Sequence, residues 1–172
     1  MRGSLPLSSG IIREYRVFGG PYMNRPHGTI GLKMAVEIQA RCDINVPTED
    51  YSVPKDEDAL KGLEAAVHDI LHGLPVYVGC LGGIGRTGLM LALIAKAWGV
   101  KDPVAYVREH YYPHAVETKE QQAFIRDFEV PPRLRWKIKM ARLKDTFRLG
   151  DKHLTLGAPE LLKKVVKPTK KY

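Results

Sequence analysis

One segment restricts the fold more than any other: residues 75–98, where a short apolar run leads through a glycine-rich loop into a helix-forming stretch. Val76-Tyr77-Val78 is β-branched and aromatic, which predicts a buried strand. Residues 87–98 are good helix formers with almost no polar face, so we expect a buried helix that ends at Gly99. The order strand, loop, helix is typical of α/β domains.

The sequence around this segment predicts further helices. Apolar residues at three- and four-residue spacing predict a helix from Asp56 to Gly73, and residues 104–111 and 117–128 predict two more. We expect a strand within 36–46. Residues 1–30 show no clear period, and turns are expected there at Gly19-Gly20-Pro21 and at residues 25–28.

Length and composition favour one compact domain with an appendage. The 172 residues are 44% hydrophobic, enough to fill a core. No run of about 18 apolar residues is present to cross a bilayer, and Met1–Gly10 lacks the apolar stretch of a secretory signal. We therefore expect a cytoplasmic protein whose two cysteines, Cys42 and Cys80, stay reduced.

The net charge of +8 is concentrated at the C-terminal end. From Pro131 onward thirteen Lys and Arg face three Asp and Glu, a balance of +10 that leaves −2 for residues 1–130. We expect a domain over 1–130 and, over 131–172, a basic helical extension with a disordered tail from Lys163 to Tyr172. The extension either contacts nucleic acid or an anionic surface, or is a solvated helix face.

The loop between Cys80 and Arg86 predicts an anion-binding site. Its three glycines let successive backbone N–H groups converge on one point, and the helix that follows directs its positive end there. Such a site stabilises a thiolate at Cys80, and the planar fork of Arg86 can hold two phosphate oxygens. Thr87 can donate its hydroxyl to the sulfur. We expect phosphate to contact Leu81, Gly82, Gly83, Ile84, Gly85 and Arg86.

The run Cys80-Leu-Gly-Gly-Ile-Gly-Arg86-Thr87 is similar to the signature of the protein tyrosine and dual-specificity phosphatase superfamily, in particular to its compact dual-specificity members. This resemblance implies an α/β fold with a central, mostly parallel sheet flanked by helices. It also implies a cysteinyl-phosphate intermediate and no metal or other cofactor. One position departs from the pattern: Gly79 stands where the family usually has His before the nucleophile.

The leaving oxygen needs a proton donor, and Asp50 is the preferred candidate. Asp50-Tyr51-Ser52-Val53-Pro54 lies 30 residues before the cysteine and is similar to the Asp-x-x-x-Pro of the family's acid loop. Nearby acidic residues remain as competitors: Asp43, Glu49, Asp56 and Asp58. Asp56 and Asp58 also suit the first turn of a helix.

The second step needs a positioned water. Residues 117–121 resemble the family's water-holding loop, with Glu117 and Gln121 at its polar positions. Because Glu117 replaces a glutamine, we expect Gln121 to orient the water. The alternative is an ordinary helix start capped by Thr118.

These residues together predict a phosphatase that acts on phosphotyrosine, and on phosphoserine or phosphothreonine, in proteins. Two alternatives stay open. An RNA 5′-phosphatase uses the same cysteine chemistry and would suit the basic C-terminal segment. A catalytically weak phosphate-binding module for protein interaction would suit the departures at Gly79 and Glu117. The sequence does not predict the oligomeric state.

Overall fold

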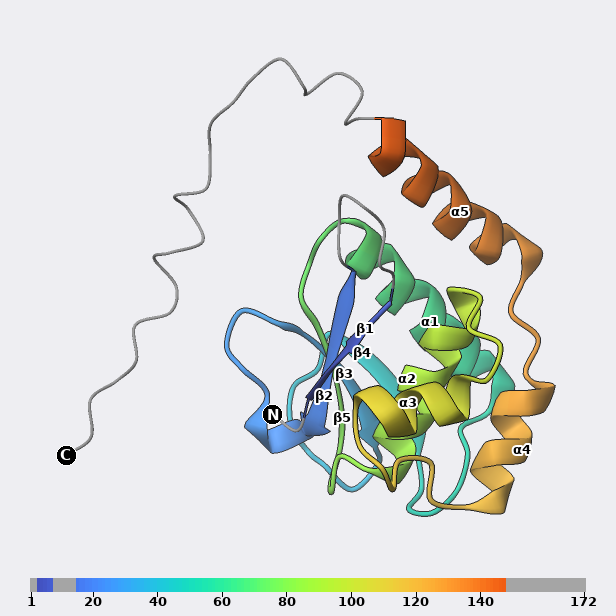
Figure 1. Ribbon diagram of the computed structural model, residues 1–172. Coiled ribbons are helices and arrows are strands. Elements are labelled where there is room, and N and C mark those ends of the chain that lie inside the picture. The colour runs from blue at the N-terminus through green and yellow to red at the C-terminus, as the bar shows by residue number, and fades with distance from the viewer. Residues whose placement is uncertain (1–2, 8–14, 148–172) are drawn as a thin grey trace.

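The computed structural model describes residues 3–7 and 15–147, and Figure 1 shows a twisted sheet with the α-helices gathered on one side. The sheet has five strands in the order β1-β2-β5-β3-β4. β2, β5, β3 and β4 run parallel, and β1 pairs antiparallel with β2 at one edge. The predicted α/β fold with a mostly parallel sheet is confirmed. The strands are β1 Gly3–Pro6, β2 Arg16–Pro21, β3 Ile30–Ala35, β4 Ile44–Thr48 and β5 Val76–Cys80.

The helices follow the predicted segments closely, because each of those segments carries a helical apolar pattern. A short 3-10 helix, η1, spans Tyr22–Asn24. The α-helices are α1 Asp56–Leu71, α2 Gly85–Ala97, α3 Pro103–His110, α4 Lys119–Asp127 and α5 Pro132–Phe147. Within residues 3–7 and 15–147 none of the helices has the length and apolarity needed to cross a membrane. The predicted disordered tail, Lys163–Tyr172, lies outside the described residues.

Two predictions about the first half of the chain need correction. The strand expected within 36–46 is β4, which begins only at Ile44, and residues 36–43 form the turn-containing segment that joins β3 to it. The Asp43 carboxylate shapes this segment by accepting a hydrogen bond from the Gly31 backbone N–H at 2.7 Å. The turn expected at Gly19-Gly20-Pro21 is instead the end of strand β2. Glycine suits this strand because the Tyr111 ring occupies the space beside it. A Cβ at Gly19 would lie 2.9 Å from that ring.

Helix α2 forms the centre of the core. Residues 89–95 are all fully buried, and α2 contacts β5, α1, α3 and α4. Strand β5 runs directly into the loop that begins α2. The carboxyl ends of the parallel strands and the amino end of α2 therefore meet at one edge of the sheet, where ligands bind in open α/β folds.

A close contact between α1 and β4 generates a stability prediction. Gly62 lies in α1, and a Cβ at this position would be 2.2 Å from Cγ2 of Val46. Helix propensity alone predicts that Gly62→Ala stabilises by about 1 kcal/mol. We expect instead a loss of about 1–3 kcal/mol in the free energy of unfolding, because the added methyl overpacks the contact. Chemical denaturation measures this change.

The matched background is Val46→Ala, which removes the opposing methyl groups. There Gly62→Ala should cost much less, giving a coupling energy in the double-mutant cycle. A stabilising Gly62→Ala in the wild-type background would contradict the close contact.

Candidate active site

The loop after β5 curls around the sulfur of Cys80. Cys80 is 3% exposed, and its Sγ accepts hydrogen bonds from the Gly83 backbone N–H and from the Thr87 hydroxyl, both at 3.2 Å. Thr87 Oγ1 also accepts the Cys80 backbone N–H at 2.9 Å. Tyr111, the residue directly after α3, donates its hydroxyl to the Gly83 carbonyl at 2.6 Å and so holds the loop. The sulfur is thus contacted by one donor from the loop and one from α2.

The guanidinium of Arg86 lies next to this loop and is held by three segments. It is 2% exposed, and its two terminal nitrogens bind both carboxylate oxygens of Glu37 at 2.6 and 2.8 Å. Nη1 also donates to the Thr48 carbonyl at 3.0 Å, and Nη2 lies 2.9 Å from Oδ1 of Asp50. Nε is buried and has no hydrogen-bond partner among the described residues. This nitrogen therefore keeps an N–H that can donate to a further acceptor.

The charges around Arg86 shift the pKa values of the pair. Burial lowers the pKa of Arg86, but the hydrogen bond to Glu37 and the negative charges of Cys80, Asp50 and Glu37 outweigh it, so the pKa lies above its ordinary value. The hydrogen bond from Arg86 is the main cause that holds the pKa of Glu37 below its ordinary value. Both groups are therefore charged over the neutral pH range. Glu37 is not among the residues predicted from the sequence. No motif around it indicates that it pairs with Arg86, 49 positions away.

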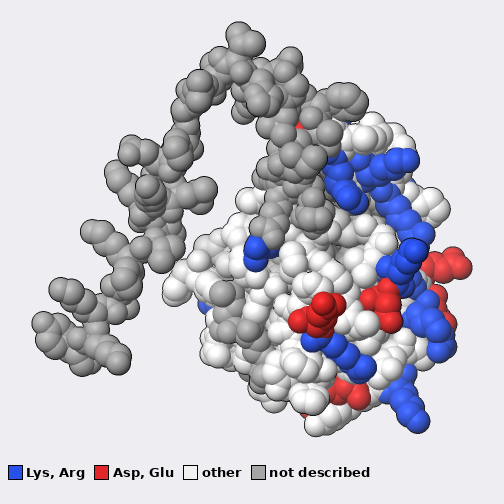
Figure 2. All heavy atoms as spheres, viewed as in Figure 1, with Lys and Arg blue, Asp and Glu red and all other residues white. Residues whose placement is uncertain are grey.

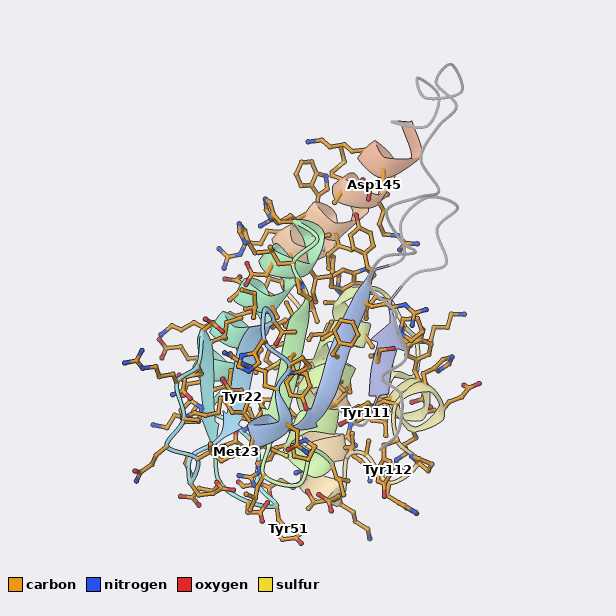
Figure 3. All side chains as sticks on the ribbon, turned by 90° about the vertical axis from the view of Figure 1, so that its left-hand side faces the viewer. Tyr22, Met23, Tyr51, Tyr111, Tyr112 and Asp145 are labelled. Atoms are coloured by element: carbon orange, nitrogen blue, oxygen red, sulfur yellow. The ribbon has the colours of Figure 1, made fainter. Side chains whose placement is uncertain are left out.

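The predicted acid, Asp50, lies in the lining of a cavity of about 240 Å³ that also contains Cys80 and Arg86. Its side chain is 58% exposed, so solvent reaches the carboxylate. The next residue, Tyr51, has a left-handed backbone (φ 57°), an uncommon conformation for a bulky side chain. Figure 3 shows Tyr51 at the end of the molecule opposite Asp145 of α5.

The competing carboxylates lie elsewhere. Asp43 binds Arg25 at 2.8 Å and the Gly31 N–H, and this backbone hydrogen bond is the main reason why the pKa of Asp43 is lowered. Asp56 and Asp58 occupy the first turn of α1, where they complement the helix dipole. Neither they nor Glu49 belong to the cavity lining, which contains Asp50 and Glu117 as its acidic residues.

Gln121 is fully buried, does not line the cavity itself, and has both ends of its amide engaged by backbone groups. Its Oε1 accepts the Glu117 backbone N–H at 2.9 Å, and the side chain forms a capping box with Thr118. Its Nε2 donates to the Ser52 carbonyl at 3.2 Å and so links α4 to the acid loop. The alternative, a capped helix start, is thus the arrangement observed. Glu117 is the residue of this loop that lines the cavity.

Gly79 has a packing reason for its departure from the family pattern. A Cβ at this position would lie 2.7 Å from Cα of Tyr22 and 3.0 Å from the Gly20 carbonyl oxygen. The backbone at the start of η1 therefore occupies the space that a histidine side chain would need. Tyr22 is itself 3% exposed and donates its hydroxyl to the Arg41 carbonyl at 2.9 Å.

No group of three or more His, Cys, Asp or Glu is placed to hold a metal ion within the part of the chain that the structure describes. Cys42 and Cys80 are both free thiols.

Part of this chain is similar in sequence to known proteins. Residues 29–99 match a family profile described as "Polymorphic toxin system, DSP-PTPase phosphatase". Two uncharacterised proteins of Methanocaldococcus jannaschii are 43% and 42% identical to this chain over 83 residues. The alignments cover 48% of this chain and 56% and 52% of those proteins, so the chain spans about half the length of the curated relatives that it matches.

Two solved structures share the fold at low sequence identity. The active form of Tk-PTP matches with a TM-score of 0.52 and 24% identity, covering 59% of this chain and 79% of that protein. Kinase associated phosphatase, with its catalytic-site cysteine replaced by serine, matches with a TM-score of 0.55 and 14% identity, covering 80% of this chain and 94% of that one. Fold, loop and family profile are together similar to those of the protein tyrosine and dual-specificity phosphatase superfamily.

The close approach at Gly79 predicts the effect of a single methyl group. Gly79→Ala should lower the free energy of unfolding by about 1–3 kcal/mol, because the Tyr22 backbone must shift to admit it. Gly82→Ala is the matched control, since a Cβ there has no atom within 4 Å. Urea denaturation compares the two. Equal stability of both variants would contradict the packing account of Gly79.

The lowered pKa of Glu37 predicts how stability depends on pH. A carboxylate whose pKa is depressed in the folded state contributes stability above its unfolded pKa of roughly 4.3, and loses that contribution as pH falls through the folded value. The wild type should therefore be more stable than Glu37→Gln at pH 6–7, and the difference should shrink below about pH 4.3.

Denaturation at a series of pH values measures this difference. Glu109→Gln, an exposed change on α3, controls for the loss of one carboxylate. A difference between the wild type and Glu37→Gln that does not change with pH would show that the Arg86 contact does not contribute to stability.

Proposed function

We propose that this chain hydrolyses phosphate monoesters on protein side chains, phosphotyrosine above all, through a cysteinyl-phosphate intermediate. The observation that carries the proposal is the grouping of the Cys80 sulfur, the Arg86 guanidinium and the Asp50 carboxylate around one cavity of about 240 Å³. Superfamily and fold support phosphatase activity, and the described geometry supplies each group that the two chemical steps need.

In the first step the Cys80 sulfur attacks phosphorus, and the bond from phosphorus to the leaving oxygen breaks. Arg86 and the N–H groups of the loop hold the phosphoryl oxygens as their charge changes. Asp50 gives its proton to the leaving oxygen, so that the product leaves as a neutral alcohol or phenol. The Thr87 hydroxyl, 3.2 Å from the sulfur, stabilises the thiolate before attack and again as it leaves.

In the second step a water attacks phosphorus, the sulfur–phosphorus bond breaks, and Asp50 accepts the proton of the water. Glu117 lines the same cavity and is placed to orient this water. Gln121 then acts as a positioning residue: it caps α4, accepts the Glu117 N–H and holds Ser52 of the acid loop. This assignment replaces the direct contact with water that we expected of Gln121.

The character of the cavity supports a phosphoprotein over an RNA 5′-end. Arg86 is the cation of the lining, whereas Asp50 and Glu117 are acidic, so the extra phosphates of a triphosphate would meet like charge. Tyr51 and Leu81 are 63% and 56% exposed and offer apolar contacts to an aromatic side chain. The retained nucleophile, clamp and acid favour an enzyme over a phosphate-binding module.

Replacing the nucleophile tests the proposal directly. Cys80→Ser should reduce hydrolysis of p-nitrophenyl phosphate and of a phosphotyrosine peptide to background while phosphate binding is retained, because the loop donors and Arg86 remain. Cys42→Ser, outside the cavity lining, is the matched control and should retain activity. Persistent turnover in Cys80→Ser, or faster release of phosphate from 5′-triphosphorylated RNA than from the peptide, would overturn the assignment.

Replacing the acid tests a different step. Asp50→Ala should lower kcat by about 10²–10⁴-fold with little change in KM, since the acid acts in the transition state. The loss should be larger for phenyl phosphate than for p-nitrophenyl phosphate, whose leaving group needs a proton less. Asp58→Ala, in the first turn of α1, is the control. A loss of the same size for both leaving groups would argue against Asp50 as the proton donor.

A further inference from the structure

Helix α5 carries two apolar faces, of which one is packed. Leu134 and Ile138 are 4% and 2% exposed and lie against the domain. Trp136, Met140 and Leu143 follow at spacings of four and three residues, which places them on the opposite side of the helix. Trp136 is 65% and Leu143 39% exposed. Among the described residues α5 therefore presents a second apolar stripe, Trp136-Met140-Leu143, of which Met140 is half-buried.

Cations edge this stripe on both sides. Figure 2 shows Lys and Arg side chains gathered along α5. Asp145, the acidic residue of α5, accepts a hydrogen bond from the Tyr15 hydroxyl on the packed side. The exposed side of the helix is therefore apolar along its centre and positively charged along its edges. The edging residues are Arg133, Arg135, Lys137, Lys139, Arg142 and Lys144.

A groove of opposite character lies between α1 and α4. It has a volume of about 690 Å³. Its apolar lining comes from Val53, Leu60, Ala123, Phe124 and Phe128, and every charged residue of the lining is acidic: Asp56, Glu57, Glu120, Asp127 and Glu129. We call it the acidic groove.

The stripe and the acidic groove belong to consecutive parts of the sequence, but they cannot contact each other within one chain. The groove lining ends at Glu129, and α5 begins three residues later at Pro132. The packed face of α5 is held against α1 and α2, so its stripe faces away from the groove's own domain. In a two-fold pair each α5 can enter the groove of the other copy, which closes the assembly and covers both surfaces.

We propose that the partner of this surface is a second copy of the chain, with the Trp136-Met140-Leu143 stripe of each copy docked in the acidic groove of the other. Opposite charges edge the two apolar surfaces, which fixes the register of such a contact. A lipid surface or a nucleic acid would match the cations of α5 but would leave the apolar lining of the acidic groove uncovered. The proposal is independent of the phosphatase chemistry.

Two charge-reversed variants of the full chain test this contact. The groove variant is Glu120→Lys with Glu129→Lys, and the helix variant is Lys137→Glu with Lys139→Glu. Sedimentation velocity over a dilution series should show a monomer–dimer equilibrium for the wild type that weakens with added salt. Each variant alone should associate at least about tenfold more weakly, because two like-charged surfaces then face each other.

Mixing the two variants gives the decisive measurement. In the mixed pair the unchanged helix meets the unchanged groove, and the reversed helix meets the reversed groove. An equimolar mixture should therefore regain the wild-type association constant, whereas each variant alone keeps its weakened association. Trp136→Ala should also weaken wild-type association, because it removes the largest exposed side chain of the stripe.

Single reversals on other surfaces serve as controls. Lys101→Glu and Glu109→Lys are exposed and lie outside both surfaces, so they should leave association unchanged. Circular dichroism and thermal unfolding verify that every variant is folded. A mixture that stays monomeric would overturn the proposal.

Other outcomes would identify a different occupant and also overturn the proposal. If the groove variant loses association while the helix variant keeps it, another basic segment binds the groove. If the wild type is monomeric at all concentrations and only the helix variant loses binding to anionic phospholipid vesicles or to single-stranded RNA, α5 contacts that anionic partner.

Discussion

The buried guanidinium of Arg86 is the constraint on which the site depends. A charge that is almost fully removed from water is tolerated only when fixed partners surround it. Glu37, the Thr48 carbonyl and Asp50 supply these partners from the segment after β3, the end of β4 and the acid loop. One side chain thus ties three separate segments to the start of α2 and leaves Nε as a donor inside the site.

The cysteine loop is fixed by contacts from outside itself. Tyr111 holds the Gly83 carbonyl, and the backbone of Tyr22 packs on Gly79, so the loop has supports on both sides. Gln121 connects the start of α4 with Ser52 in the acid loop. Cys80, the loop of Asp50 and the start of α4 are therefore parts of one packed unit. This arrangement fixes the hydrogen-bond donors around the sulfur in advance.

Charge is distributed differently around the Cys80 cavity and along α5. The cavity around Cys80 combines one buried cation, Arg86, with two acidic residues, Asp50 and Glu117. On α5, by contrast, six Lys and Arg accompany one acidic residue, Asp145. Figure 3 places Asp145 of α5 and Tyr51 of the acid loop at opposite ends of the molecule. The positive charge of α5 therefore lies away from the cavity that Tyr51 lines.

The sequence by itself determined the strand–loop–helix unit, the α/β class and the pairing of Cys80 with Arg86, because these follow from local periodicity and from a loop of fixed length. It also indicated Asp50, which the structure places 2.9 Å from Arg86. It did not indicate Glu37, strand β3 or the hydrogen bond from Gln121 to Ser52, and it placed the start of β4 too early. Only tertiary structure decided these, because burying a charge or an amide selects partners by distance in space rather than by spacing along the chain.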